Sequence, residues 1–133
     1  MTKIIYLDTN VYLDLYFGRK GSLTTLRIFK RTLGCEFKIV FSDWNMYEIT
    51  KSGVDLKELR IFFDSIDKRG KMIKVYRAEN DVQEAKKISP EHFQDPLHAI
   101  LAKKGGAELL ITSDANGFNN CKHLVQTQLP ENI

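Results

Sequence analysis

The sequence predicts an α/β fold of three layers, in which a central parallel sheet is covered by helices on both faces. Two observations predict it. Short runs rich in β-branched and aromatic residues alternate along the chain with longer segments of helical period, and 133 residues are enough for one hydrophobic core. Because no repeat, low-complexity stretch or linker interrupts the alternation, we expect residues 1–133 to form a single domain.

Strand patterns recur at five places, each a short apolar run bounded by polar or glycine residues. The last of them has the least regular pattern. The expected strands are residues 3–7, 37–41, 72–76, 109–112 and 124–126.

Helix patterns fill the segments between these strands. Asp95 followed by Pro96 is a favoured helix start, because Asp caps free backbone N–H groups and proline suits the first helical position. A short helix is expected near Asn10. Longer ones are expected from Ser22 to Gly34 with Leu23, Leu26, Phe29 and Leu33 at helical spacing, from Ser42, from Asp55 to Gly70, from Glu79 to Ile88, and from Asp95 to Lys104.

The composition excludes several classes of protein. Hydrophobic residues make up 43% of the chain and charged residues 28%, which is the balance of a globular protein rather than a disordered one. No apolar run is long enough to cross a bilayer, and Asp8 comes too early for a signal peptide, so we expect a cytoplasmic protein without a membrane partner. Cys35 and Cys121 are then reduced. The net charge of +3 allows a polyanionic partner without predicting one.

Four acids fall where a ligand site is expected. In parallel α/β sheets, ligands gather beyond the carboxyl ends of the strands. Asp8 follows the first strand and Asp114 the fourth, while Glu48 lies on the helix after the second strand and Asp95 opens the helix before the fourth. We therefore expect these four carboxylates to converge on one rim of the sheet, with Asn10 and Asn116 beside them.

Such a cluster requires a positive partner, because two carboxylates ~4 Å apart repel by about 4 kcal/mol at the effective dielectric of a protein surface. The three histidines share no ligand spacing with one another or with the cysteines, which argues against zinc. An all-oxygen site suits Mg²⁺ or the similar Mn²⁺. The chemistry that this predicts is metal-assisted hydrolysis of a phosphodiester.

The residues also resemble a known family. The segments Asp8-Thr9-Asn10, Tyr47-Glu48-Ile49, Asp95-Pro96-Leu97-His98-Ala99 and Thr112-Ser113-Asp114 are similar, in order and spacing, to the four acidic motifs of PIN-domain ribonucleases. The resemblance covers nearly the whole chain. It implies a strand order of 3-2-1-4-5, dependence on Mg²⁺ or Mn²⁺, and cleavage of single-stranded RNA that leaves a 5′-phosphate. In size the chain is similar to VapC-type toxins, which implies a homodimer bound by a cognate antitoxin.

One position departs from the family pattern. Many relatives carry a further Asp two residues after the fourth acid, where this chain has Asn116. Asn keeps hydrogen-bonding groups but removes a negative charge. We therefore expect Asp8, Glu48, Asp95 and Asp114 to hold one ion, and a second ion to arrive only with the scissile phosphate.

Several of these residues have two possible roles. Asp8 and Asp95 are potential helix caps as well as metal ligands, and Asn10 either caps a helix or orients Asp8 or Asp114. The hydroxyls of Thr112 and Ser113 are candidates for holding the attacking water or a phosphate oxygen. Arg19 is a candidate contact to an RNA phosphate, whereas His98 is expected to pack beside the sheet rather than to act as a base.

Two alternative functions fit the same pattern. One is an RNA-processing PIN nuclease unrelated to toxins, and the other is a non-catalytic scaffold of the same fold. A phosphoaspartate receiver or a haloacid-dehalogenase-like phosphatase fits poorly, because the chain lacks the paired acids or the Asp-x-Asp motif that each requires.

Overall fold

The computed structural model describes residues 2–133, and their centre is a sheet of five parallel strands. The order of the strands is β3-β2-β1-β4-β5, and every neighbouring pair is parallel, which confirms the predicted order. The strands are β1 (Lys3–Leu7), β2 (Phe37–Ser42), β3 (Met72–Val75), β4 (Leu109–Ile111) and β5 (Gln126–Gln128).

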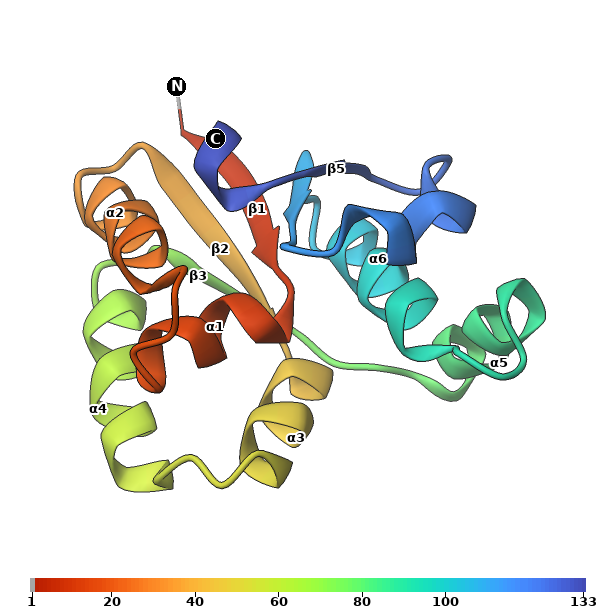
Figure 1. Cartoon of the computed structure of the whole chain (residues 1–133), viewed down its shortest axis with the longest axis horizontal. Helices are drawn as coiled ribbons and strands as arrows, with labels where there is room; N and C mark the ends of the chain where they lie inside the picture. Colours follow the sequence, from red (N-terminus) through yellow and green to blue (C-terminus); the bar gives the residue numbers. More distant parts are fainter. Residues whose placement is uncertain (1) are drawn as a thin grey trace.

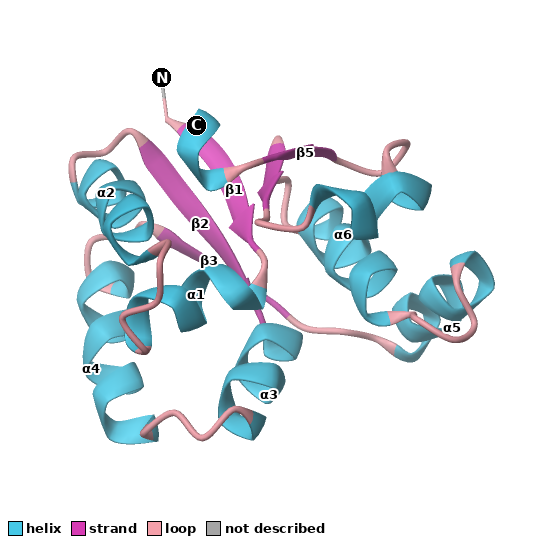
Figure 2. Ribbon diagram, in the orientation of Figure 1, coloured by secondary structure: helices cyan, strands magenta, loops and turns pink. Residues whose placement is uncertain are grey.

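Helices cover both faces of this sheet (Figures 1 and 2), so the predicted three-layer architecture is confirmed. In Figure 1, α1, α2 and α4 lie on one side of the strands, and α5 and α6 lie on the other. The helices are α1 (Thr9–Tyr16), α2 (Ser22–Leu33), α3 (Asp43–Lys51), α4 (Leu56–Asp67), α5 (Glu79–Ile88) and α6 (Gln94–Lys104), with short 3₁₀ helices η1 (Ala115–Cys121) and η2 (Pro130–Asn132). None of the helices in the described residues is long and apolar enough to cross a bilayer.

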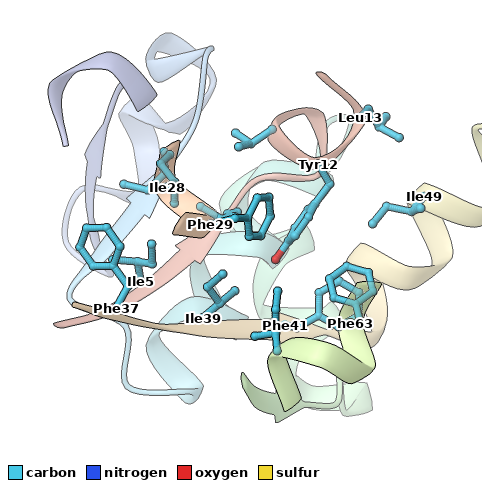
Figure 3. Close-up of a cluster of buried hydrophobic side chains, with 14 of the residues drawn as sticks. Ile5, Tyr12, Leu13, Ile28, Phe29, Phe37, Ile39, Phe41, Ile49 and Phe63 are labelled. Atoms are coloured by element: carbon cyan, nitrogen blue, oxygen red, sulfur yellow. The ribbon is translucent and has the colours of Figure 1, made fainter. Parts of the chain in front are cut away.

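Two hydrophobic clusters form the core, one on each face of the sheet. Successive residues of a strand point to opposite faces, and β1 shows this directly: Ile5 and Leu7 belong to one cluster, whereas Tyr6 belongs to the other. The first cluster includes the aromatic contacts of Tyr12 with Phe29 and Phe63 (Figure 3). Burial on both faces fixes the register of β1, because a shift by one residue would exchange its two faces.

The buried face of α2 differs from the prediction. Leu23 is 73% exposed, and Leu26 and Leu33 are also exposed, whereas Thr25 and Thr32 are buried together with Ile28 and Phe29. Both threonines donate their hydroxyl hydrogen to a backbone carbonyl one turn earlier, which satisfies the hydroxyl and allows its burial. Of the predicted apolar positions, only Phe29 lies in the core.

Several element boundaries also differ from the prediction: β2 ends one residue later than expected, and β3 and β4 each end one residue earlier. The last strand lies two residues later than expected, because a turn from Leu124 N–H to the carbonyl of Cys121 continues η1 and delays the start of β5. The helix expected to be capped by Asp95 begins at Gln94, with Phe93 at the N-cap position. Asp95 therefore lies in the first turn of α6, and its carboxylate does not cap the helix.

The close packing of α6 on the sheet gives a stability prediction. A Cβ atom at Gly105 would lie 2.4 Å from Cγ1 of Val40, a contact too short to exist without movement. We expect Gly105→Ala to lower the free energy of unfolding by about 1–3 kcal/mol, the usual cost of overpacking a core. Gly34→Ala is the matched control in urea denaturation, since Gly34 ends α2 at nearly the same φ and a Cβ there would make only an ordinary contact. Equal stability of the two variants would contradict the packing.

Candidate active site

The carboxyl ends of β1, β2 and β4 bring the four predicted acids to one pocket of about 170 Å³. Asp8 follows β1, Glu48 lies on the helix after β2, Asp114 follows β4, and Asp95 lies in the first turn of α6. Residues more than 100 positions apart in the chain thus share one cavity. Its lining residues are Asp8, Thr9, Asn10, Leu13, Glu48, Ser52, Asp95, His98 and Asp114.

Asp8 is held at the end of β1 by Thr112, the residue directly after the neighbouring strand β4. It is 7% exposed, and although it occupies the N-cap position of α1, its side chain makes no capping hydrogen bond. Instead, the buried hydroxyl of Thr112 donates to Oδ2 of Asp8 (2.9 Å) and accepts from the backbone N–H of Asp114 (3.1 Å). Thr112 therefore links the first acid to the fourth and leaves Oδ1 of Asp8 without a donor at hydrogen-bond distance among residues 2–133.

Glu48 is anchored through one oxygen. The hydroxyl of Thr9 donates to Oε1 of Glu48 (2.7 Å), and Nε2 of His98 lies 2.6 Å from the same oxygen. Burial favours the neutral carboxyl, but the hydrogen bond and charge of His98 and the hydrogen bond from Thr9 outweigh it and hold the pKa of Glu48 below its usual range. Glu48 is therefore a carboxylate at neutral pH.

The surroundings of His98 favour its positive charge, as those of Glu48 favour its negative charge. Burial of its imidazole favours the neutral ring, but the hydrogen bond to Glu48 and the negative charges of Asp8, Glu48 and Asp95 raise the pKa of His98. The prediction that His98 packs beside the sheet is confirmed, because the residue is 1% exposed. Its contact with Glu48 was not predicted.

Asp95 and Asp114 lie against the backbone of η1. A Cβ atom built on Gly117 would lie 2.5 Å from Oδ2 of Asp95 and 3.3 Å from Oδ2 of Asp114, so both carboxylates lie close to this glycine. Burial, reinforced by the charge of Asp8 and then by those of Asp114 and Glu48, raises the pKa of Asp95 to about 6. The charge of His98 opposes this rise but does not cancel it, so the pocket keeps an excess of negative charge around Asp95.

Other predicted residues lie at different distances from this pocket. Asn10 lines it and is exposed, whereas Thr112 is the residue that orients Asp8. Ser113 and Asn116 are exposed and do not line the pocket. Arg19 also lies outside the lining, where its guanidinium is 3.8 Å from the carboxylate of Asp14.

Sequence reasoning missed a set of buried polar residues behind Glu48. The hydroxyl of Tyr6 is 2.6 Å from Nδ1 of His98 and 2.8 Å from Oγ of Ser42. Two spacings could have indicated part of this set, because His98 lies three residues after Asp95 on one helix, and Asn45 lies three residues before Glu48 on another. We call the closed hydrogen-bonded set the polar ring; it comprises Tyr6, Thr9, Ser42, Asn45, Glu48 and His98.

The donor set fits a hard divalent cation. Within residues 2–133, no Lys or Arg forms an ion pair with any of the four carboxylates, whose only ionic partner is His98. The side chains as they stand do not form a ready-made cage: in this part of the chain, no three His, Cys, Asp or Glu side chains lie close enough together to hold a metal ion. Mutual repulsion keeps carboxylates apart when no counter-charge lies between them. The pocket thus has the oxygen chemistry and the excess negative charge that Mg²⁺ or Mn²⁺ requires.

The contact of η1 with the acids gives a second prediction. We expect Gly117→Ala to weaken Mn²⁺ binding by about tenfold, the lower end of the effect of disturbing the residues that support a metal ligand, because its methyl group would displace the Asp95 carboxylate. Asn119→Ala, an exposed change on the same 3₁₀ helix, serves as the control. Calorimetric titration at pH 7.5 measures both affinities, and unchanged affinity in Gly117→Ala would refute the contact.

Comparison with known proteins identifies the family. The model of the PIN domain matches residues 5–124, which is most of the chain. The chain belongs to the PIN-domain family. PIN domains are generally nucleases and usually use divalent metals, which agrees with the acidic pocket at the carboxyl end of the sheet.

Solved structures of other PIN-like chains share the fold. VapBC2 from Rickettsia felis, bound to a DNA fragment from its promoter, contains a chain that matches with a TM-score of 0.57 and 16% identity over 95% of this chain and 98% of that one. FitAB bound to the IR36 DNA fragment matches with a TM-score of 0.59 and 15% identity over 95% and 94% of the two chains. No curated protein sequence matches the chain.

Proposed function

We propose that this PIN-domain protein is a Mg²⁺- or Mn²⁺-dependent ribonuclease that hydrolyses phosphodiester bonds of single-stranded RNA, and that it is the toxin of a type II toxin–antitoxin pair. The observation that supports the enzymatic part is the pocket lined by Asp8, Glu48, Asp95 and Asp114, in which no lysine or arginine of the described residues neutralises the four acids. A divalent cation would supply positive charge beyond that of His98, the only ionic partner of the four acids among residues 2–133.

The four carboxylates would hold the ion, which when bound activates water for attack and stabilises negative charge on the phosphoryl oxygens. The chain's own groups do the rest. Thr112 orients Asp8, Thr9 and His98 orient Glu48, and one carboxylate of the pocket accepts the proton of the attacking water. Asn116 lies outside the pocket lining, and we propose one resident ion, with a second arriving with the scissile phosphate.

The proposed partners are the RNA substrate, a cognate antitoxin and a second copy of the chain. The two solved relatives named above, VapBC2 and FitAB, support a toxin–antitoxin role. We propose a cytoplasmic location, in which the free thiols of Cys35 and Cys121 would stay reduced.

The rival functions are distinguishable. A non-catalytic scaffold of this fold has no reason to keep four acids in one pocket, yet all four line it here. An RNA-processing nuclease would share the pocket and differ in its biology. A small neighbouring gene for a DNA-binding protein, and growth arrest on expression that is relieved by that neighbour, would support the toxin; normal growth would count against it.

The activity itself is tested with the purified chain and a fluorescent single-stranded RNA. We expect cleavage with Mn²⁺ or Mg²⁺, none with EDTA, and recovery when metal is restored. Duplex RNA and single-stranded DNA of the same sequence are the matched substrates, and we expect both to be cut more slowly. Cleavage that persists in EDTA, or no cleavage of any RNA with either metal, would contradict the proposal.

A further inference from the structure

The two oxygens of the Glu48 carboxylate have different surroundings. Oε1 accepts hydrogen bonds from Thr9 and His98, at 2.7 and 2.6 Å, whereas Oε2 has no hydrogen-bond partner among residues 2–133. Glu48 lines the acidic pocket with 27% of its side chain exposed. We propose that His98 is a positioning residue of the metal site, which holds Oε1 of Glu48 so that Oε2 alone binds the cation. The proposal rests on the metal-dependent function proposed above.

His98 is suited to this task because both of its ring nitrogens are engaged. Nε2 contacts Oε1 of Glu48, and Nδ1 contacts the hydroxyl of Tyr6, each at 2.6 Å. The ring is 1% exposed and also packs edge-on against Tyr6. Any rotation of the imidazole would break both hydrogen bonds inside the core, where an unpaired polar group costs about 1–3 kcal/mol.

Because both ring nitrogens of His98 already make hydrogen bonds, two other roles for this residue are excluded. A metal-binding histidine needs a free nitrogen lone pair directed at the ion, and a general base needs one within reach of the attacking water. Neither nitrogen of His98 is free, and the carboxylate of Asp8 is 3.7 Å from Nε2, beyond hydrogen-bond distance. His98 therefore acts through Glu48.

The second donor to Oε1 is fixed by the rest of the polar ring. Nδ2 of Asn45 donates to Oγ1 of Thr9 (3.1 Å), so the hydroxyl hydrogen of Thr9 remains directed to Glu48. Asn45 is itself held by the capping box of α3. Oγ of Ser42 accepts from the backbone N–H of Asn45, and the side-chain Oδ1 of Asn45 accepts from the backbone N–H of Ser42.

Closure of the polar ring connects five elements to one carboxylate oxygen, since Thr9 is the first residue of α1. Tyr6 comes from β1, Ser42 from β2, Asn45 and Glu48 from α3, and His98 from α6. Apart from Glu48, every member is buried. Buried polar networks that are fully satisfied are rigid, and rigid support of a ligand raises metal affinity, so the loss of such support costs about 10–100-fold.

Two amide substitutions of His98 distinguish the positioning of Glu48 from a purely packing role of the imidazole. In His98→Gln, the amide nitrogen occupies the place of Nε2 and can still donate to Glu48. In His98→Asn, the shorter side chain reaches only the place of Nδ1, beside Tyr6. We measure the dissociation constant for Mn²⁺ from the electron paramagnetic resonance signal of the free ion. We expect His98→Asn to weaken binding by about 10–100-fold and His98→Gln to stay within about threefold of the parent.

A double variant tests whether the effect passes through Glu48. In a Glu48→Gln background, His98→Asn should cause no further loss of Mn²⁺ affinity, because the positioned ligand is already absent. Circular dichroism melting verifies that each variant is folded. If His98→Asn does not fold, Thr9→Val removes the other donor to Oε1, and we expect it to weaken Mn²⁺ binding as well.

The outcomes distinguish this proposal from the function on which it rests. A parent protein that binds no Mn²⁺ would refute the proposed function. A parent that binds Mn²⁺, together with a folded His98→Asn variant of equal affinity, would overturn the positioning role alone. The same conclusion would follow if Asn and Gln at position 98 weakened binding equally, if the loss persisted in full in the Glu48→Gln background, or if Thr9→Val, used in place of an unfolded His98→Asn, bound like the parent.

Discussion

Replacing Asp8 with Asn is expected to slow Mn²⁺-dependent cleavage of single-stranded RNA by about 10²–10³-fold, the cost of losing one preorganised charged group at a reaction centre. Asp8 follows the central strand β1 and is 7% exposed. Asn has nearly the same shape and keeps an oxygen for the hydroxyl of Thr112, so the fold should persist while the negative charge is lost. Initial rates on a fluorescent RNA at saturating Mn²⁺ measure the effect.

Two further variants control this experiment. Asp114→Asn should cause a similar loss, because Asp114 lines the same pocket and its backbone N–H donates to the hydroxyl of Thr112. Asp64→Asn removes an equal charge from an exposed position on α4 and should cleave at the parent rate. If Asp8→Asn and Asp114→Asn also cleave at the parent rate, these residues do not form the catalytic site.

Replacing Asp95 with Asn is expected to change stability in opposite directions with and without metal. Burial and the charges of Asp8, Asp114 and Glu48 raise the pKa of Asp95 to about 6 in the folded protein. Because the folded state disfavours the charged form, stability falls as the pH rises from about 4, where unfolded Asp ionises, to about 6. At pH 7.5 without metal, Asp95→Asn should therefore be more stable than the parent by about 1 kcal/mol, after discounting for the partial exposure of this carboxyl.

With Mn²⁺ present, the order of stability should reverse. The parent gains stability as the ion binds its folded form, by about 2.7 kcal/mol at 100 times the dissociation constant, whereas Asp95→Asn has lost a ligand and gains little. Urea denaturation at pH 4 and pH 7.5, with Mn²⁺ or EDTA, measures the free energy of unfolding of both proteins under all four conditions. At pH 4, the parent and the variant should differ little in EDTA, which is the internal control. A variant that is less stable than the parent in EDTA at pH 7.5 would show that Asp95 bears no electrostatic strain.

Much of the fold follows from local patterns in the sequence. β1 is predicted to the residue, because the run from Lys3 to Leu7 is apolar enough for burial on both faces and Asp8 ends it. The expected helix starts at Ser42 and Asp55 are confirmed, and each side chain caps its helix by accepting a backbone N–H of the first turn. Such signals involve neighbouring residues only, and a single sequence displays them.

The sequence-based predictions fail where tertiary contacts determine which residues are buried and which segments form strands. The exposed leucines of α2 have the spacing of a buried stripe, yet Thr25 and Thr32 occupy the core because they bond to the backbone of their own helix. Hydrophobicity alone ranks Leu above Thr and cannot anticipate this exchange. Likewise, β5 consists of Gln-Thr-Gln, which has no apolar pattern. It forms a strand because its backbone pairs with the edge of β4.

The candidate site shows the same division. Convergence of the four acids was predictable, because the rule that places ligands beyond the carboxyl ends of parallel strands depends only on strand order. The polar ring was not predictable, because its hydrogen bonds join residues as far apart as Tyr6 and His98. The spacing of His98 from Asp95 places the two on one face of a helix, but it does not indicate that the imidazole meets Glu48.

Calorimetric titration of Mn²⁺ into the purified protein at pH 7.5 is the most direct test of whether a divalent ion binds to Asp8, Glu48, Asp95 and Asp114. We predict saturable binding of about one ion per chain to the parent, and a large loss of affinity in Asp8→Asn and Asp114→Asn but not in Asp64→Asn. If the folded parent shows no saturable binding, or if the Asp8→Asn variant binds as tightly as the parent, the metal-centred account of this pocket is wrong.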